Sequence, residues 1–112
     1  MTQLRKLYYL SLILSMCILA APAVAGNDGT GQVFTMTNSA SGNEVLIFTH
    51  HPQQGLVGAG RVASGGNGTS AGLGNQGGVI LSEHHRWLYV VNAGSNSISV
   101  FGLRKGGLTL ID

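Results

Sequence analysis

Charged residues are scarce in this sequence of 112 residues: they make up 9% of it, against about 25% in an average soluble domain. Proline is also rare, with two residues, and cysteine occurs once, at Cys17. A single cysteine excludes a framework of intrachain disulfides and a zinc site built from several cysteines. The stability of the chain therefore has to come from packing and hydrogen bonding.

The few charges that are present balance once the N-terminal segment is set aside. From Gly26 onward four basic residues stand against four acidic ones, namely Arg61, Arg86, Arg104 and Lys105 against Asp28, Glu44, Glu83 and Asp112. Nucleic acid and anionic lipid require a basic patch or a net positive charge, and this part of the chain has neither. We therefore expect no nucleic-acid partner, and contact with a membrane only through the N-terminal segment.

Residues 1–25 have the three parts of a secretory signal peptide. Arg5 and Lys6 form a basic start, Leu7–Ala21 is almost wholly apolar, and Ala23-Val24-Ala25 is a small-residue cleavage pattern. We predict a signal-peptide helix, cleavage between Ala25 and Gly26, and a secreted or periplasmic protein. An uncleaved membrane anchor is the alternative, although the apolar stretch is short against the ~20 residues of a membrane span.

After Gly26 the apolar residues follow the two-residue period of β-strands, and no segment has a helical period. Runs rich in β-branched and aromatic residues lie between clusters of Gly, Asn and Ser, as strands between turns do. The runs are Val33–Thr37, Val45–Phe48, Gly78–Leu81, Trp87–Val91, Ile98–Phe101 and Leu108–Ile111. Several are apolar on both faces, which predicts an all-β fold in which one sheet lies between others.

The second half of the chain is similar to the first. Aligning VFTMTNSASGNEVLIF with WLYVVNAGSNSISVF places Asn38 on Asn92, Phe48 on Phe101, and Gly55-Leu56 on Gly107-Leu108. A repeat of about 50 residues made only of strands is typical of a β-propeller blade, which has four antiparallel strands. We expect about two blades: a partial first blade in residues 26–63 that lacks its innermost strand, a Gly-rich crossing in residues 64–78, and a second blade in residues 79–112.

The run Gly77–Asp112 resembles a blade of the seven-bladed lactonase propellers, the 6-phosphogluconolactonase-like and carboxymuconate-cyclase-like proteins. The strand that ends at Leu81-Ser82, the segment Arg86–Asn92 and the later Gly107-Leu108 carry the resemblance. The segment Phe34–Ala59 resembles the opening blade, and His84-His85 stands where the family usually turns through Asp-Gly.

This resemblance implies an exported N-terminal fragment of a propeller that hydrolyses or forms a sugar or muconate lactone. The family's proposed catalytic residues line a channel that many blades build, and no residue here matches one of them. We therefore expect the chain to be inactive by itself, with a small lactone or carbohydrate as the ligand of the complete propeller. Two alternatives are a non-catalytic extracytoplasmic binding module and a surface β-protein that self-associates through exposed strand edges, because propellers host many functions.

Candidate binding residues lie in the glycine-rich tract Gly65–Gly78. Backbone amides near Asn75 and Gln76 are candidates for binding an anionic or carbonyl group. The alternative is that the tract only connects one blade to the next, as long surface loops do. Asn38 and Asn92 are expected to have one shared structural role in turns, since Asn tolerates a left-handed backbone.

Two adjacent histidine pairs, His50-His51 and His84-His85, raise the question of a metal site. Zinc needs three or four converging ligands, and acidic residues near the histidines are few, with Glu83 beside His84 the nearest. We expect solvated turn histidines, no metal and no other cofactor. No serine, histidine or acidic motif identifies a catalytic residue.

Overall fold

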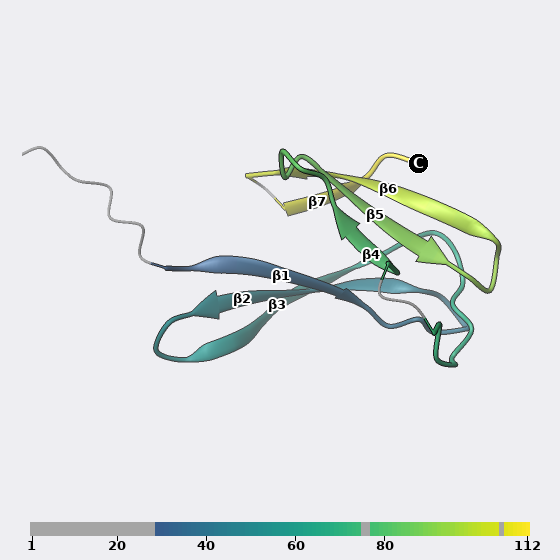
Figure 1. Ribbon diagram of the computed structural model, residues 1–112, viewed down its shortest axis with the longest axis horizontal. Helices are drawn as coiled ribbons and strands as arrows, with labels where there is room; N and C mark the ends of the chain where they lie inside the picture. Colours follow the sequence, from purple (N-terminus) through teal and green to yellow (C-terminus); the bar gives the residue numbers. More distant parts are fainter. Residues whose placement is uncertain (1–28, 75–76, 106) are drawn as a thin grey trace, which may run out of the picture.

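The computed structural model describes residues 29–74, 77–105 and 107–112, and in these residues the protein is all-β, as predicted (Figure 1). The strands are β1 (Gly31–Met36), β2 (Glu44–His51), β3 (Gly55–Ala63), β4 (Val79–Leu81), β5 (Trp87–Asn92), β6 (Ser97–Arg104) and β7 (Gly107–Leu110). None of the described residues belongs to a helix long and apolar enough to cross a membrane. The predicted signal-peptide helix and its cleavage site lie outside these residues.

The described strands form two antiparallel sheets, and in both the strand order follows the chain. The first sheet has three strands in the order β1-β2-β3, and the second has four in the order β4-β5-β6-β7. The connection from Ser64 to Gly78 leads from the last strand of the first sheet to the first strand of the second. In the second sheet β5 has β4 on one side and β6 on the other. In the first sheet β1 has only β2 beside it among the described strands.

The two sheets pack face to face over one hydrophobic core. Four side chains in it are 0–1% exposed: Val45, Leu88, Val90 and Phe101. Partly buried residues from the other strands pack against them, namely Phe34, Met36, Val62, Val79 and Leu108. Complete burial of one such side chain stabilises the fold by about 1.5–3 kcal/mol, so the contact between the sheets is a main source of stability.

The sheets are stacked with their strands in the same direction and in the same order. β1 and β5 both run from left to right in Figure 1, while β2 runs back. β1 contacts β4, and a Cβ built on Gly65, just after β3, would lie 3.5 Å from the Leu110 side chain of β7. The strands of the two sheets therefore follow the same order, as when one sheet is shifted onto the next without being turned over.

The strand registers show which residues occupy matching positions in the two sheets. His51 pairs with Gly55 at the β2–β3 turn, and Arg104 pairs with Gly107 at the β6–β7 turn. Counted back from these turns, the pair Met36–Val45 in the first sheet matches Val91–Ile98 in the second. Met36 and Val45 point into the core, whereas Ile98 is 62% exposed on the outer face. The covered face of the first sheet thus matches the uncovered face of the second.

This register corrects the predicted match of Asn38 with Asn92. β1 ends at Met36, before Asn38, whereas Asn92 is the last residue of β5 and pairs with Ser97. The residue that matches Asn92 is Thr37, whose amide donates to the Glu44 carbonyl (2.9 Å). A shift of one residue turns every side chain of a strand to the opposite face. Aligning identical residues did not reveal this one-residue shift, because the turns after β1 and β5 differ in length.

Candidate functional site

Three connections that are far apart in the sequence meet at one end of the stacked sheets. They are the β1–β2 turn, the first part of the Gly-rich crossing, and the β5–β6 turn (Figure 1). The Gly68 amide donates to the Ser39 carbonyl (2.7 Å), and the Gly94 amide donates to the Asn67 carbonyl (2.9 Å). The crossing is therefore bonded to a turn of each sheet.

Asn38 joins the β1–β2 turn to this crossing through its side chain. Its backbone is left-handed (φ 50°), a conformation that Asn adopts at less cost than most residues. Its Nδ2 donates to Ala71 O (2.7 Å) and Thr69 Oγ1 (3.1 Å), and its Oδ1 accepts from the Thr69 amide (3.0 Å). The predicted role of Asn38 in a left-handed turn is confirmed. The predicted sharing of this role with Asn92 is wrong, because Asn92 is the last residue of β5 and is 0% exposed.

Glycine is required where the crossing passes between the turns. A Cβ on Gly66 would lie 2.5 Å from Asn92 Cγ. A Cβ on Gly68 would overlap the backbone of Asn38, and one on Gly94 would overlap the Gly68 carbonyl. A real Cβ is not found that close to backbone atoms, so the close approach of these three segments depends on bare backbone.

A buried polar cluster, Asn43, Ser64, Asn92 and Ser99, lies beneath the crossing, with exposures of 0–5%. Asn43 Nδ2 donates to Asn92 Oδ1 (3.0 Å), which also accepts from Ser64 Oγ (2.7 Å). Asn92 Nδ2 donates to Ser99 Oγ (2.8 Å), and Ser99 Oγ donates to the Ser64 carbonyl (2.6 Å). Among the described residues, every buried side-chain nitrogen and oxygen has a hydrogen-bond partner. This cluster joins the two sheets and leaves no buried group for a ligand.

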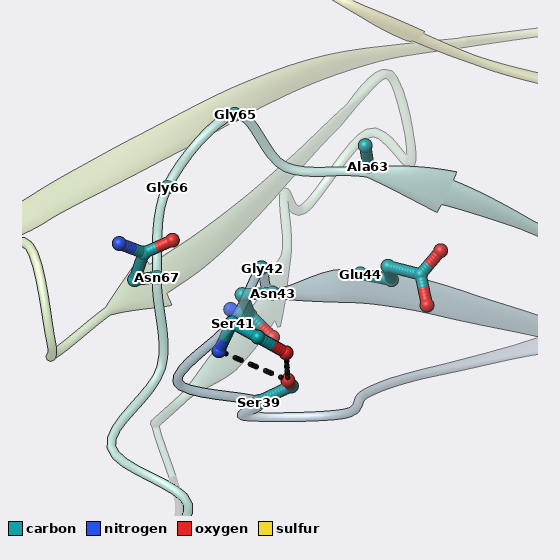
Figure 2. A pocket seen from close by; sticks show the side chains of 9 residues that line it. All are labelled: Ser39, Ser41, Gly42, Asn43, Glu44, Ala63, Gly65, Gly66 and Asn67. Carbon is teal, nitrogen blue, oxygen red and sulfur yellow. Dashed lines mark hydrogen bonds between the residues drawn. The ribbon is translucent and has the colours of Figure 1, made fainter.

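The polar residues of the β1–β2 turn also line an open depression of about 460 Å³ (Figure 2). Its other wall is the crossing, and the full lining is Ser39, Ser41, Gly42, Asn43, Glu44, Ala63, Gly65, Gly66 and Asn67. The hydroxyls of Ser39 and Ser41 are 3.0 Å apart and hydrogen-bonded. Hydroxyl and amide groups of this kind bind neutral polar ligands through hydrogen bonds.

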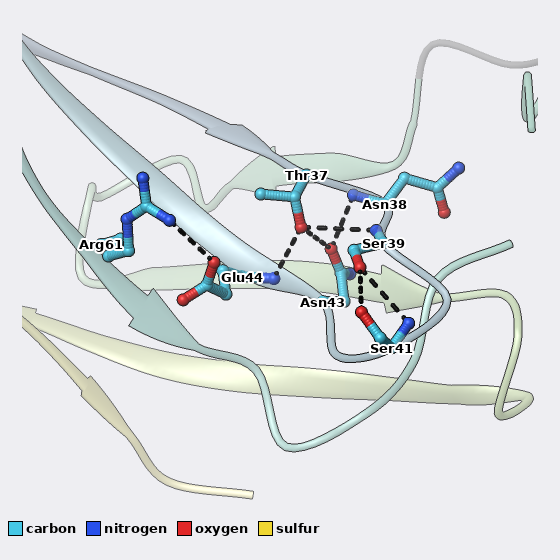
Figure 3. Close-up of polar contacts among 7 residues, drawn as sticks. All are labelled: Thr37, Asn38, Ser39, Ser41, Asn43, Glu44 and Arg61. Carbon is cyan, nitrogen blue, oxygen red and sulfur yellow. Dashed lines mark hydrogen bonds and ion pairs between the residues drawn. The ribbon is translucent and has the colours of Figure 1, made fainter. Parts of the chain in front are cut away.

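The one carboxylate at the depression is already paired. Glu44 Oε2 lies 3.2 Å from Arg61 Nη1 (Figure 3). Its amide donates to Thr37 Oγ1 (3.1 Å), which in turn donates to Asn43 Oδ1 (3.3 Å). No nucleophile in the lining is hydrogen-bonded to a histidine or a free carboxylate, the arrangement that activates a hydroxyl. The depression therefore offers hydroxyl and amide groups that can form hydrogen bonds with a ligand.

The histidine pairs are located away from this depression. His50 and His51 end β2, and His84 and His85 lie in the turn between β4 and β5. In residues 29–74, 77–105 and 107–112, no three metal-ligating side chains come together. The histidines therefore add no catalytic group to the depression.

The predicted binding residues Asn75 and Gln76 lie outside the described residues. Sequence patterns did not identify Asn43, Ser64 or Ser99, which the structure brings together with Asn92. One signal was available: Asn92 ends an apolar run and Asn43 precedes another, and a polar residue at a strand end is a candidate for a buried hydrogen bond. The separation of these residues along the chain concealed their contact.

Comparisons of the chain with known protein families, with curated proteins and with solved structures find no match.

Proposed function

We propose that this chain supplies two neighbouring blades of a lactonase-like β-propeller, and that it has no catalytic activity by itself. One observation carries the proposal: two sheets are stacked in the same orientation, and the outer face of the second is apolar. In a two-sheet sandwich that is complete, the outer faces are polar. In a propeller, each blade packs between two others.

The outer face of the second sheet, which we call the head face, is formed by side chains that alternate with the core residues. Its members are Ile80, Trp87, Tyr89, Val91, Ile98, Val100 and Ile111. Exposure is 62% at Ile98, 52% at Ile80 and 38% at Trp87 and Tyr89. With about 200 Å² for each large side chain, the exposed apolar area is on the order of 500 Å². Continuous patches of this size mark interaction surfaces.

We expect no lactonase activity because of the kinds of polar groups that the described residues bring together. Opening a lactone requires a general base near an attacking water and donors that stabilise the developing oxyanion. The open depression offers hydroxyls and amides, and its carboxylate is held by Arg61 at 3.2 Å. A channel that could hold a lactone needs groups from further sheets. The parent reaction, hydrolysis or formation of a sugar or muconate lactone, is inferred from the resemblance of Gly77–Asp112 alone.

The experiment is to incubate the purified full chain with a panel of sugar and muconate lactones and to follow ring opening by proton release. We expect rates equal to those of heat-inactivated chain. A rate above this control that is lost in a Ser41→Ala variant would overturn the claim of inactivity, and would assign the chemistry to the depression.

A second candidate function is a binding module for a neutral polyhydroxyl ligand, which the lining of the depression favours. Ser39, Ser41 and Asn67 offer hydroxyl and amide groups to the depression. Titration of the chain with neutral oligosaccharides, followed by amide chemical shifts, tests this function. Shifts at residues 39–44 and 65–67 are the expected result, and shifts scattered over the chain contradict it.

A further inference from the structure

We propose that the partner that covers the head face is a second copy of this chain, joined head to tail. The inference rests on the proposed propeller function and names its partner. The tail face is the outer face of the first sheet, formed by Val33, Thr35, Leu46, Phe48 and Leu56.

The two free faces match the two faces that already pack on each other inside the chain. In the register of the sheets, the tail residues Phe48 and Leu56 match Phe101 and Leu108, which lie in the core. The head residues Val91 and Ile98 match Met36 and Val45, which lie in the same core as Phe101 and Leu108. A tail face placed on a head face therefore repeats these contacts between aromatic and aliphatic side chains, whereas Leu46 of the tail face stands where the inner contact has Ser99.

Charges are few on both faces. Arg104, which follows Val100 and Gly102 on the same side of β6, lies at the margin of the head face near Trp87, and the tail face has the ion pair Glu44–Arg61 (3.2 Å). The arginine side chain of that pair is 67% exposed, so it can stay at the rim of an interface. The apolar patch of about 500 Å² on the head face is about half of the ~1,000 Å² in total that a specific interface buries, and on the tail face Val33 and Leu56 are 41% and 56% exposed.

Head and tail are different surfaces, so the contact is heterologous, and an open assembly keeps one free head at one end and one free tail at the other until a ring closes. Propellers contain about 4–8 blades. With the two sheets that the described residues form in each chain, a closed ring of such sheets holds two, three or four copies. The number of sheets is even, unlike the seven blades of the family that the sequence resembles.

Trp87 is an internal probe of the head face, because it is the one tryptophan of the chain. It lies over Gly102, where a Cβ would be 3.7 Å from Trp87 Cζ3 and 3.5 Å from Ile111 Cδ1. Its exposure in the single chain is 38%. A copy that covers the head face must shield this indole from solvent and from water-soluble quenchers.

The first measurement is the mass of the purified full chain in solution by light scattering, over a hundredfold range of concentration. We expect a mass of two, three or four chains, and acrylamide quenching of Trp87 that falls as the assembly forms. A continuous distribution of ever larger species would overturn ring closure.

The second measurement separates head-to-tail contact from head-to-head contact. Ile98→Asp places a carboxylate on the head face and Val33→Asp places one on the tail face; the two residues are 62% and 41% exposed in the single chain. Each variant alone is expected to associate about a hundredfold more weakly, because an unpaired carboxylate would be buried. Gln53→Asp adds the same charge at the exposed β2–β3 turn and is expected to assemble like the unchanged chain.

An equal mixture of the two interface variants is the decisive sample. One intact head and one intact tail remain, so head-to-tail contact predicts a complex of two chains, one of each variant. Head-to-head contact instead predicts that Val33→Asp alone dimerises and that the mixture gains nothing, and this result would overturn the proposal.

The two proposals fail in different ways. A monomer at all concentrations, with Trp87 open to quencher and the head face binding a hydrophobic dye, overturns self-assembly and leaves the propeller role in place. A monomer with Trp87 shielded and no dye binding means that the chain covers its own head face. That result overturns both proposals.

Discussion

The side chains of Asn43 and Asn92 meet between the two sheets, where Asn43 Nδ2 donates a 3.0 Å hydrogen bond to Asn92 Oδ1. Both residues are at most 1% exposed. Each stands at a strand end in its own sheet, and Asn92 also accepts from Ser64 and donates to Ser99. Because a polar group without a partner is costly in a dry interior, this contact selects one position of the sheets relative to each other.

Asn92→Ala is predicted to be strongly destabilising. It removes the acceptor of Asn43 and Ser64 and the donor to Ser99, so that buried polar groups lose their partners. Each such group costs about 1–3 kcal/mol, and we expect the free energy of unfolding to fall by about 3 kcal/mol. Urea unfolding followed by circular dichroism measures it. The control is Asn67→Ala, at an exposed residue, with a change within about 0.5 kcal/mol. Equal losses in the two variants would contradict the role of the cluster.

Gly68→Ala is predicted to disrupt the end of the molecule where the three connections meet. The new Cβ would overlap the Asn38 backbone, and overpacking of this kind costs about 1–3 kcal/mol. Gly72→Ala is the matched control, because a Cβ there meets nothing within 4 Å. It is expected to be neutral or stabilising by up to about 1 kcal/mol. Thermal unfolding of both variants checks the difference, and a Gly68→Ala protein as stable as the control would show that the crossing can move away.

Phe101→Ala and Phe48→Ala compare two matching positions, one covered and one on the tail face. Phe101 is 0% exposed, and truncation of such a residue costs about 3–5 kcal/mol. Phe48 is half-buried, and its loss is expected to cost less than half as much. Unfolding is measured in the Ile98→Asp background, which removes the contribution of association. Equal costs would mean that the tail face is already covered in the single chain.

Asn38→Gly and Asn38→Ala separate the backbone and the side-chain contributions of this residue. Both variants lose the hydrogen bonds to Thr69 and Ala71. Glycine keeps the left-handed backbone (φ 50°) at no steric cost, whereas a left-handed alanine costs about 1–2 kcal/mol. We expect Asn38→Ala to be less stable than Asn38→Gly by about 1 kcal/mol in urea unfolding. Equal stability would show that the turn has relaxed out of this conformation.

The positions of the strands could be predicted from residue types. The run Trp87–Val91 alternates apolar side chains on both faces, and the structure places Leu88 and Val90 in the core with Trp87 and Tyr89 outside. β3 was harder to predict in full, because Gly58 and Gly60 interrupt its apolar residues and a bulge opposite Ile47 and Phe48 shifts its register. The candidate site was found only in part: the crossing was recognised, but its role in joining the turns was not.

The alternation of apolar residues and the spacing of turn residues were sufficient to predict an all-β chain with short strands, because these patterns reflect local backbone preference. The order of residue types did not determine which face of each strand is buried or that Asn43 contacts Asn92. It also did not show that Thr37, rather than Asn38, is the residue that matches Asn92. Those relationships depend on strand register and on the stacking of one sheet on another. Register shifts by a single residue reverse the faces, so contacts between distant segments were decided only when the sheets packed together.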